Sequence, residues 1–270
     1  MKNLLMPNKK FLIFKKMKML QIRQKRMNMI NNLRRSLLPF QLKSQYDSII
    51  PLNIFQTWHS HMLPPGMARA VRKMRFNNPR FKYHLYDDNE CREFIKNNYN
   101  EEILNAFDSL VPGAYKADLW RYCILHSLGG IYVDIKYECF NNFKFIHLTE
   151  SEHFVADIDG NGIYNALMVC LPGNPILWEA IQRIIRNVKD RYYGDSCLHP
   201  TGPMLLSSII QDRKNVDLQH KLISGNFNYR VIMYQNKITL KSYDGYLNES
   251  SRNQKTDHYS ALWNRRQIYQ

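Results

Sequence analysis

The sequence has few cysteines and no long apolar run. Its five cysteines are scattered among 270 residues without a Cys-x-x-Cys pair, so we expect reduced thiols, no disulfides and no zinc site. The longest apolar run in the first 46 residues spans only residues 11–14, whereas a membrane-spanning helix needs about 20. We therefore expect a cytoplasmic protein, at most peripheral to a membrane, with no transmembrane helix or standard signal peptide.

Acidic residues are absent from residues 1–46, which contain 12 Lys or Arg. The rest of the chain has 26 basic and 23 acidic residues, so the formal net charge of +15 comes mainly from this segment. The near-equal numbers of basic and acidic residues in 47–270 argue against a nucleic-acid-binding fold. We predict a flexible or surface-associating arm at 1–46 and a catalytic domain at 47–270. The arm is a weak membrane-surface helix at best, because its apolar residues lie on every side of a helix. It fits contact with anionic lipid or nucleic acid, an organelle transit sequence or simply a solvated tail, and a protein that binds nucleic acid or an anionic surface through this arm remains an alternative function.

Three familiar catalytic motifs are missing as well. The chain has no Gly-x-Ser-x-Gly elbow, no His-Glu-x-x-His helix and no phosphate-binding Gly-x-x-x-x-Gly-Lys-Ser/Thr loop. Their absence argues against the usual hydrolases, zinc proteases and nucleotide triphosphatases. What is present, with 44% hydrophobic and 13% aromatic residues, is the composition of a globular domain with a substantial core.

Apolar strands alternate with helices from residue 49 onward. The predicted strands cover residues 49–55, 81–85, 131–135 and 165–171. The predicted helices cover residues 67–76, 89–98, 101–110, 117–127, 175–187 and 203–211. This order predicts an α/β fold with a mainly parallel central sheet flanked by helices, in which ligands bind beyond the carboxyl ends of the strands.

The most informative stretch runs from residue 116 to residue 136. Asp118 and Arg121 are three residues apart and share one face of the predicted helix, where they form either an active-site pair or an ordinary surface ion pair. Gly129 and Gly130 end that helix and lead into a short apolar strand. Asp134 then emerges at the sheet edge, where it serves catalysis or caps a neighbouring element.

A series of motifs, spread over about residues 49–265, resembles glycosyltransferase family 32. They are Ile-Pro-Leu-Asn-Ile-Phe-Gln-Thr-Trp at 50–58, Asn-Pro at 78–79, Tyr-Asp-Asp at 86–88, Lys-Ala-Asp-Leu-Trp-Arg-Tyr at 116–122, Gly-Gly-Ile-Tyr-Val-Asp at 129–134, Thr-Gly-Pro at 201–203, and His258 followed by Trp263. The chain is similar to the capsular-polysaccharide-type members of bacteria and large DNA viruses. The resemblance implies a GT-A fold and transfer from a nucleotide-diphosphate-sugar donor to a glycan or glycolipid acceptor, with retention of configuration.

The resemblance also implies roles for individual residues. Trp58 would pack on the base of the donor, and Asp118 and Arg121 would hold its sugar and phosphates. Tyr132 would line the pocket, and Asp134 would contact the ribose or a metal ion. A site of this kind needs positive charge aimed at the departing diphosphate.

Lys136 departs from the family pattern, because it stands where the second Asp of the Asp-x-Asp motif is expected. A protonated lysine cannot ligate manganese or magnesium. Three explanations remain: a divalent cation held weakly by Asp134 and His258, a metal-free site in which Lys136 supplies the charge, or an inactive nucleotide-sugar-binding descendant. We expect Glu138 on the same strand face as Asp134 and Lys136, where it is a candidate substitute ligand. We predict that Asp134, Lys136 and Arg121 are catalytic.

Overall fold

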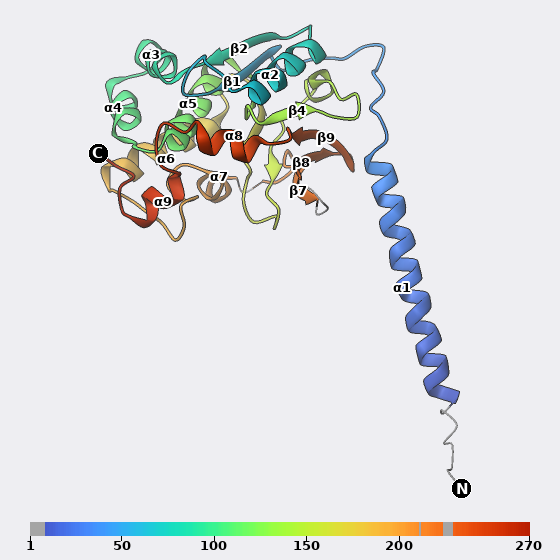
Figure 1. Cartoon of the computed structure of the whole chain (residues 1–270). Coiled ribbons are helices and arrows are strands. Elements are labelled where there is room, and N and C mark those ends of the chain that lie inside the picture. The colour runs from blue at the N-terminus through green and yellow to red at the C-terminus, as the bar shows by residue number, and fades with distance from the viewer. Residues whose placement is uncertain (1–8, 211, 224–228) are drawn as a thin grey trace.

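The computed structural model describes residues 9–210, 212–223 and 229–270. The first eight residues of the predicted arm, and Gln211 at the predicted end of a helix, lie outside the described residues. A compact body carries one long helix, α1 (Lys9–Ser36), that leads away from it (Figure 1). Helices α3 and α4 lie at one end of the body and strands β7–β9 lie toward the other.

The first sheet has the strand order β2-β1-β3-β6. Its strands are β1 (Asn53–Thr57), β2 (Lys82–Tyr86), β3 (Gly130–Val133) and β6 (Leu167–Cys170). Strand β1 pairs in parallel with both β2 and β3, and only β6 runs antiparallel to its neighbour. The predicted α/β class and mainly parallel central sheet are confirmed. The carboxyl ends of β1, β2 and β3 therefore meet at one edge.

Helices cover one face of this sheet. They are α3 (Asp88–Asn98), α4 (Glu101–Ser109), α5 (Gly113–Leu128), α6 (Pro175–Lys189) and α7 (Pro203–Ile209), while α2 (Pro65–Asn77) packs near β4. Phe55 and Tyr132 point from the strands into the helical core. Local signals set the helix starts: Asp87 forms a capping box with Glu90, and Asn174 caps α6.

A second, mostly antiparallel sheet covers the opposite face, with the order β4-β9-β8-β7-β5. Its strands are β4 (Tyr137–Cys139), β5 (Val155–Ala156), β7 (Leu218–Ile223), β8 (Tyr229–Tyr234) and β9 (Lys237–Ser242). Ile54 and Ile131 of the first sheet share one hydrophobic core with Ile232 and Leu240 of the second. Sequence patterning had not predicted this sheet. The remaining elements are the 3-10 helix η1 (Phe145–Leu148), α8 (Tyr246–Arg252) and α9 (Tyr259–Asn264).

The junction between α1 and the body is packed. Phe40 is only 6% exposed and lies edge-on to Phe143, with the ring centroids 5.1 Å apart. Asn141 donates a hydrogen bond to the backbone oxygen of Ser36, and Tyr46 is hydrogen-bonded to the ring of His147. The packed core therefore includes residues that precede position 47.

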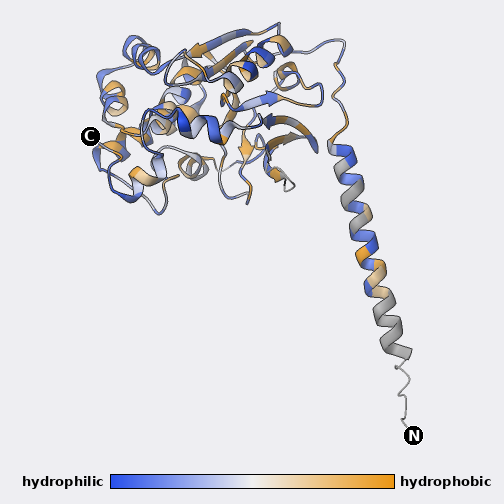
Figure 2. Ribbon diagram, viewed as in Figure 1, coloured by the Kyte–Doolittle hydropathy of each residue, from blue (hydrophilic) through white to orange (hydrophobic). Residues whose placement is uncertain are grey.

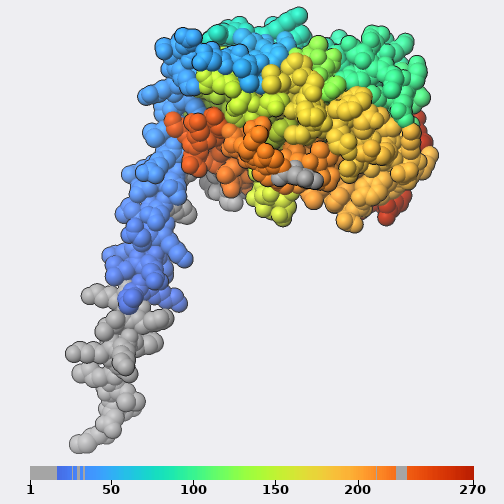
Figure 3. Space-filling model, turned by 180° about the vertical axis from the view of Figure 1, so that it is seen from behind, coloured from blue at the N-terminus to red at the C-terminus, as the bar shows by residue number. Residues whose placement is uncertain are grey.

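The coloured part of helix α1 stands clear of the body in the space-filling view (Figure 3). Hydrophobic and hydrophilic residues are mixed along the coloured part of the helix (Figure 2). None of the helices in the described part of the chain is long and apolar enough to cross a membrane.

Candidate active site

Two glycines set the path of the chain from α5 into β3. Gly129 and Gly130 have φ angles of +61° and +120°, which favour glycine. A Cβ on Gly130 would lie 2.9 Å from the backbone oxygen of Asn53, so β3 can approach β1 closely only without a side chain there. Strand β3 then ends at Val133, and the amide of Asp134 donates to the backbone oxygen of Ala166. The two glycines therefore bring Asp134 to the edge where β1 and β3 end.

The Asp134 carboxylate is held by three side chains. Tyr132 donates its hydroxyl to Oδ1 at 2.9 Å, and Lys136 donates to Oδ2 at 2.5 Å. Arg121 Nη1 lies 3.5 Å from Oδ1. Burial opposes ionisation of Asp134, but Lys136 and Arg121 outweigh it, so the pKa of this carboxyl lies below its usual value. We call Arg121, Tyr132, Asp134 and Lys136 the Asp134 cluster.

Lys136 is a nearly buried cation, with a side chain only 12% exposed. The rings of Tyr137, Tyr164 and Tyr246 surround its ammonium at 5.4, 5.3 and 6.0 Å. Burial opposes its charge, but the neighbouring Asp134 outweighs that effect and raises the pKa of Lys136. Lys136 is therefore held as a charged group, which rules out an exposed strand-end position for it.

Arg121 is also buried, and it joins the Asp134 cluster to helix α5 and to the residues before β6. Its Nη1 donates to the backbone oxygen of Asn165 at 2.9 Å, and its guanidinium lies 4.3 Å from the centre of the Tyr132 ring. Its Nη2 is 3.4 Å from Asp118 Oδ1, and only 6% of Arg121 and 8% of Asp118 are exposed. The pair is thus not an ordinary surface ion pair.

Asp118 belongs to a buried hydrogen-bond network that sequence reasoning had identified only in part. Asn165 donates to Oδ1 at 2.9 Å, and Thr201 donates to Oδ2 at 2.7 Å. Burial raises the pKa of Asp118, while Arg121 and these two hydrogen bonds oppose the rise. Thr201 was part of a recognised motif, but Asn165 was missed, because an isolated Asn before a strand carries no local signal.

Trp58 follows β1 at the same sheet edge and is half-buried. It packs on the small apolar cluster that includes Met67 and Ile135. Because Ile135 lies between Asp134 and Lys136 in the chain, this packing connects Trp58 to the Asp134 cluster. Its indole N–H is buried and, among the residues that the structure describes, has no hydrogen-bond partner. Because this N–H is shielded from solvent, it donates a hydrogen bond to a ligand at this edge only if the indole ring moves.

Two residues considered as metal ligands, His258 and Glu138, have other hydrogen-bond partners. His258 is exposed and caps α9, with Nδ1 accepting from the amide of Ser260. Glu138 is bonded to Lys73 of α2 at 2.8 Å. The prediction that Glu138 shares a strand face with Asp134 is wrong, because the chain turns at residues 134–136 and the two-residue alternation of a strand does not continue through it.

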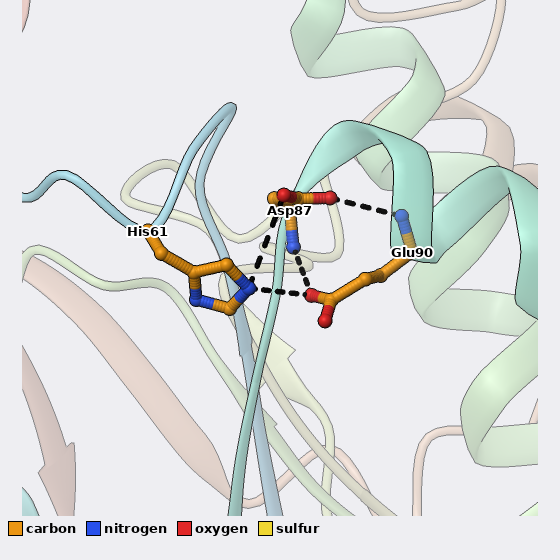
Figure 4. A group of neighbouring side chains, drawn as sticks. All are labelled: His61, Asp87 and Glu90. Atoms are coloured by element: carbon orange, nitrogen blue, oxygen red, sulfur yellow. Dashed lines mark hydrogen bonds and ion pairs between the residues drawn. The ribbon is translucent and has the colours of Figure 1, made fainter.

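Among the residues that the structure describes, one group with metal-ligating side chains lies at the surface. His61 Nε2 is 2.8 Å from Glu90 Oε2 and 3.9 Å from Asp87 Oδ2 (Figure 4). Asp87 and Glu90 also bond each other's backbone amides as the capping box of α3. The acidic residues after β2 thus have a structural explanation as the start of a helix.

The residues around Asp134 do not fit a divalent cation. Both carboxylate oxygens of Asp134 already accept from cations or a hydroxyl, and the ammonium of Lys136 occupies the side of Oδ2. At about 4 Å, two like unit charges repel by roughly 4 kcal/mol at an effective dielectric of 20, and a dication doubles that value. The described carboxylates of Asp118 and Glu138 have their own partners. A metal ion would have to displace at least one built-in cation.

Comparison with known proteins finds a family model that matches the part of the chain around this cluster. Residues 64–154 match the family model of the glycosyltransferase sugar-binding region containing a DXD motif. Over these residues the chain is similar to glycosyltransferases. The resemblance to glycosyltransferase family 32 is thereby confirmed, and the matched region holds the whole Asp134 cluster and Asp118. Trp58 and His258 lie outside it.

Two curated relatives illustrate the similarity of the glycosyltransferase region. Inositol phosphoceramide mannosyltransferase 3 of Schizosaccharomyces pombe is 29% identical over 63% of this chain and 47% of its own. An uncharacterised glycosyltransferase of Acanthamoeba polyphaga mimivirus is 34% identical over 35% of this chain and 38% of its own. The chain spans about half the length of the first of these relatives. Among solved structures, PaToxG glycosyltransferase superposes with a TM-score of 0.49 and 15% identity, covering 60% of this chain and 68% of that one.

Proposed function

We propose that this chain is a glycosyltransferase that moves a sugar from a nucleotide-diphosphate-sugar donor to a glycan or glycolipid acceptor, with retention of configuration. One observation carries the proposal. Within the matched region, two buried cations, Arg121 and Lys136, converge on Asp134 at the sheet edge where ligands of α/β proteins bind. Such an arrangement suits a ligand that has both negative charge and hydroxyl groups.

The chemistry requires charge stabilisation more than a separate base. The bond between the anomeric carbon and the diphosphate oxygen breaks, and its electron pair stays on the diphosphate. The acceptor hydroxyl oxygen forms the new bond to the same carbon, and its proton passes to the leaving diphosphate oxygen. Fixed cations stabilise the negative charge that develops on that oxygen. If the acceptor attacks on the face from which the diphosphate leaves, configuration is retained.

The contacts support distinct roles for the residues. Arg121 and Lys136 would bind diphosphate oxygens, and Asp134 would hold both cations while it accepts from a donor hydroxyl. Tyr132 would line the pocket beside them, and Trp58 would pack on the nucleoside base. Asp118 would act as a positioning residue, because its two oxygens are already bonded within the protein and it lies against Arg121.

The names of the relatives suggest the acceptor class. Several are mannosyltransferases that act on inositol phosphoceramide, so we propose a membrane glycolipid as the first acceptor to test. Helix α1 supports this choice, because residues 1–46 lack acidic side chains and Met19, Leu20 and Ile22 are exposed along it. A basic helix with exposed apolar side chains suits the surface of an anionic bilayer.

A ligand screen tests the proposal. Thermal unfolding of the full chain is followed with a panel of UDP-sugars and GDP-sugars, and any donor that stabilises the protein is then assayed for sugar release and transfer. We expect stabilisation by one base and release of its diphosphate. Stabilisation without turnover would favour a nucleotide-sugar-binding pseudoenzyme. Binding of nucleic acid instead of every donor would favour a protein that works through its basic arm.

A further inference from the structure

We propose that the Lys136 ammonium replaces the divalent cation at the donor diphosphate, so that this chain binds and uses its donor without a metal ion. The inference rests on the proposed function and departs from the DXD description of the matched family. On this inference, the replacement of the second carboxylate by Lys136 exchanges a metal ligand for a positive charge that contacts the diphosphate directly.

The first argument is the place of the ammonium. Lys136 Nζ lies 2.5 Å from Asp134 Oδ2, on the carboxylate that a metal ion would need as its ligand. Arg121 approaches the other oxygen at 3.5 Å. Asp134 therefore already has two positive neighbours, and a dication would meet repulsion from both. A fixed positive charge is thus present next to Asp134 before any ligand arrives.

The second argument is the unused bonding capacity of Lys136. An ammonium group has three N–H donors. Within residues 9–210, 212–223 and 229–270, Asp134 is the one hydrogen-bond acceptor found for Lys136 Nζ, and the remaining neighbours are the faces of three tyrosine rings. A nearly buried ammonium with donors to spare is suited to phosphate oxygens, which accept strong charge-assisted hydrogen bonds.

The third argument is how firmly the turn that bears Lys136 is fixed. Ile135 is 5% exposed and packs in the cluster with Met67 and Tyr243. The amide of Tyr243 donates to the backbone oxygen of Lys136 at 2.9 Å. Because the backbone is anchored on both sides of the turn, the lysine is oriented before the donor binds, which lowers the entropic cost of binding.

The test measures binding of the nucleoside diphosphates UDP and GDP to the full chain by calorimetry, once in EDTA and once in manganese chloride. We expect the affinity for the preferred diphosphate to be the same within about threefold in the two buffers. Lys136→Met keeps the apolar stem and removes the charge, so it should weaken binding in EDTA by about 10- to 100-fold, and manganese should not restore it. Lys136→Arg should retain most of the binding.

Lys136→Asp is the sharpest variant, because it recreates an Asp-x-Asp sequence. We expect it to lose binding in EDTA and to regain part of it with manganese. The matched control is Lys96→Met on the exposed face of α3, which should bind like the parent chain. Thermal unfolding of each variant confirms that it is folded.

The outcomes separate this inference from the proposed function. If the parent chain binds a diphosphate only with manganese, the metal-free inference is overturned and the proposed function stands. Unchanged binding by folded Lys136→Met would overturn it as well. If no nucleoside diphosphate binds in either buffer, the proposed function fails, and the inference fails with it.

Discussion

The side-chain amide of Gln56 donates hydrogen bonds to the backbone oxygens of Asp134, at 3.3 Å, and Val133, at 3.2 Å. Gln56 is fully buried in β1, and its own oxygen accepts from the Tyr83 hydroxyl at 2.6 Å. A polar residue in the middle of a core strand thus fixes the point at which β3 ends. The geometry of the Asp134 cluster depends on this second strand.

Gln56→Met should therefore destabilise the protein and disturb the cluster. Methionine fills a similar volume but leaves the backbone oxygens and the Tyr83 hydroxyl without this partner, which costs roughly 2–4 kcal/mol. Urea unfolding measures the loss of free energy of unfolding. Gln45→Met, at an exposed position, serves as the control and should change it by less than about 0.5 kcal/mol. Equal effects of the two substitutions would contradict this role of Gln56.

Gly130→Ala should be much more damaging than Gly113→Ala. The Cβ at position 130 would meet a backbone oxygen at 2.9 Å, in a conformation with φ of +120°. We expect a loss of about 2–4 kcal/mol. At Gly113, in the first turn of α5, nothing lies within 4 Å of the added Cβ, so the change should be neutral or stabilising by up to about 1 kcal/mol. Thermal or urea unfolding of both variants checks the contrast.

Asp134→Asn should nearly abolish sugar transfer while the protein still folds. The amide has one acceptor oxygen in place of two and turns N–H donors toward groups that are themselves donors. We expect the rate to fall by about 100-fold or more, because loss of one preorganised electrostatic group has an effect of that size. Transfer from a radiolabelled donor measures the rate. Activity within a few-fold of the parent chain would show that Asp134 is structural.

Lys136→Met should reduce stability in a pH-dependent way. The pKa of Asp134 is lowered in the folded protein, so its ionised form contributes stability above about pH 4, and this contribution is lost as the pH falls through the lowered value. The raised pKa of Lys136 keeps its charge, and thus its contribution, until the pH rises above about 10.

We therefore expect the free energy of unfolding of the parent chain to exceed that of Lys136→Met by about 1–3 kcal/mol. This difference should be constant from about pH 6 to pH 9 and should shrink below about pH 4. Urea unfolding at a series of pH values measures it. A difference that grew as the pH fell would be inconsistent with an Asp134–Lys136 ion pair.

Two truncations should separate membrane binding from folding. Deletion of residues 1–34 removes most of α1 but keeps Ser36 and Phe40, so the body should unfold as before while binding to anionic vesicles weakens. Deletion of residues 1–44 also removes the buried Phe40 and should cost about 3–5 kcal/mol of stability. Vesicle sedimentation at low and high salt, with thermal unfolding, gives both readouts. Undiminished vesicle binding by the shorter deletion would show that α1 is not the attachment site.

The sequence by itself determined the local features of this protein. Hydrophobic periodicity marked the strands of the first sheet and most of its helices, and the Gly129-Gly130 pair indicated where a helix turns into the strand that delivers Asp134. These features depend on neighbours in the chain, because side-chain period and backbone conformation are properties of a few consecutive residues. The order of the motifs was sufficient to identify the family.

The tertiary structure alone decided which charged groups meet. Glu138 pairs with Lys73 of α2, and Lys136 turns onto Asp134 beside the rings of Tyr164 and Tyr246, which come from distant segments. The second sheet and the burial of Phe40 likewise arise from contacts between distant segments. Asp134 and Lys136 are two positions apart, and the turn between them decides whether their side chains meet. The packing of β4, α8 and β9 fixes that turn. The charge at the candidate site is therefore a property of the fold, although each residue that supplies it is visible in the sequence.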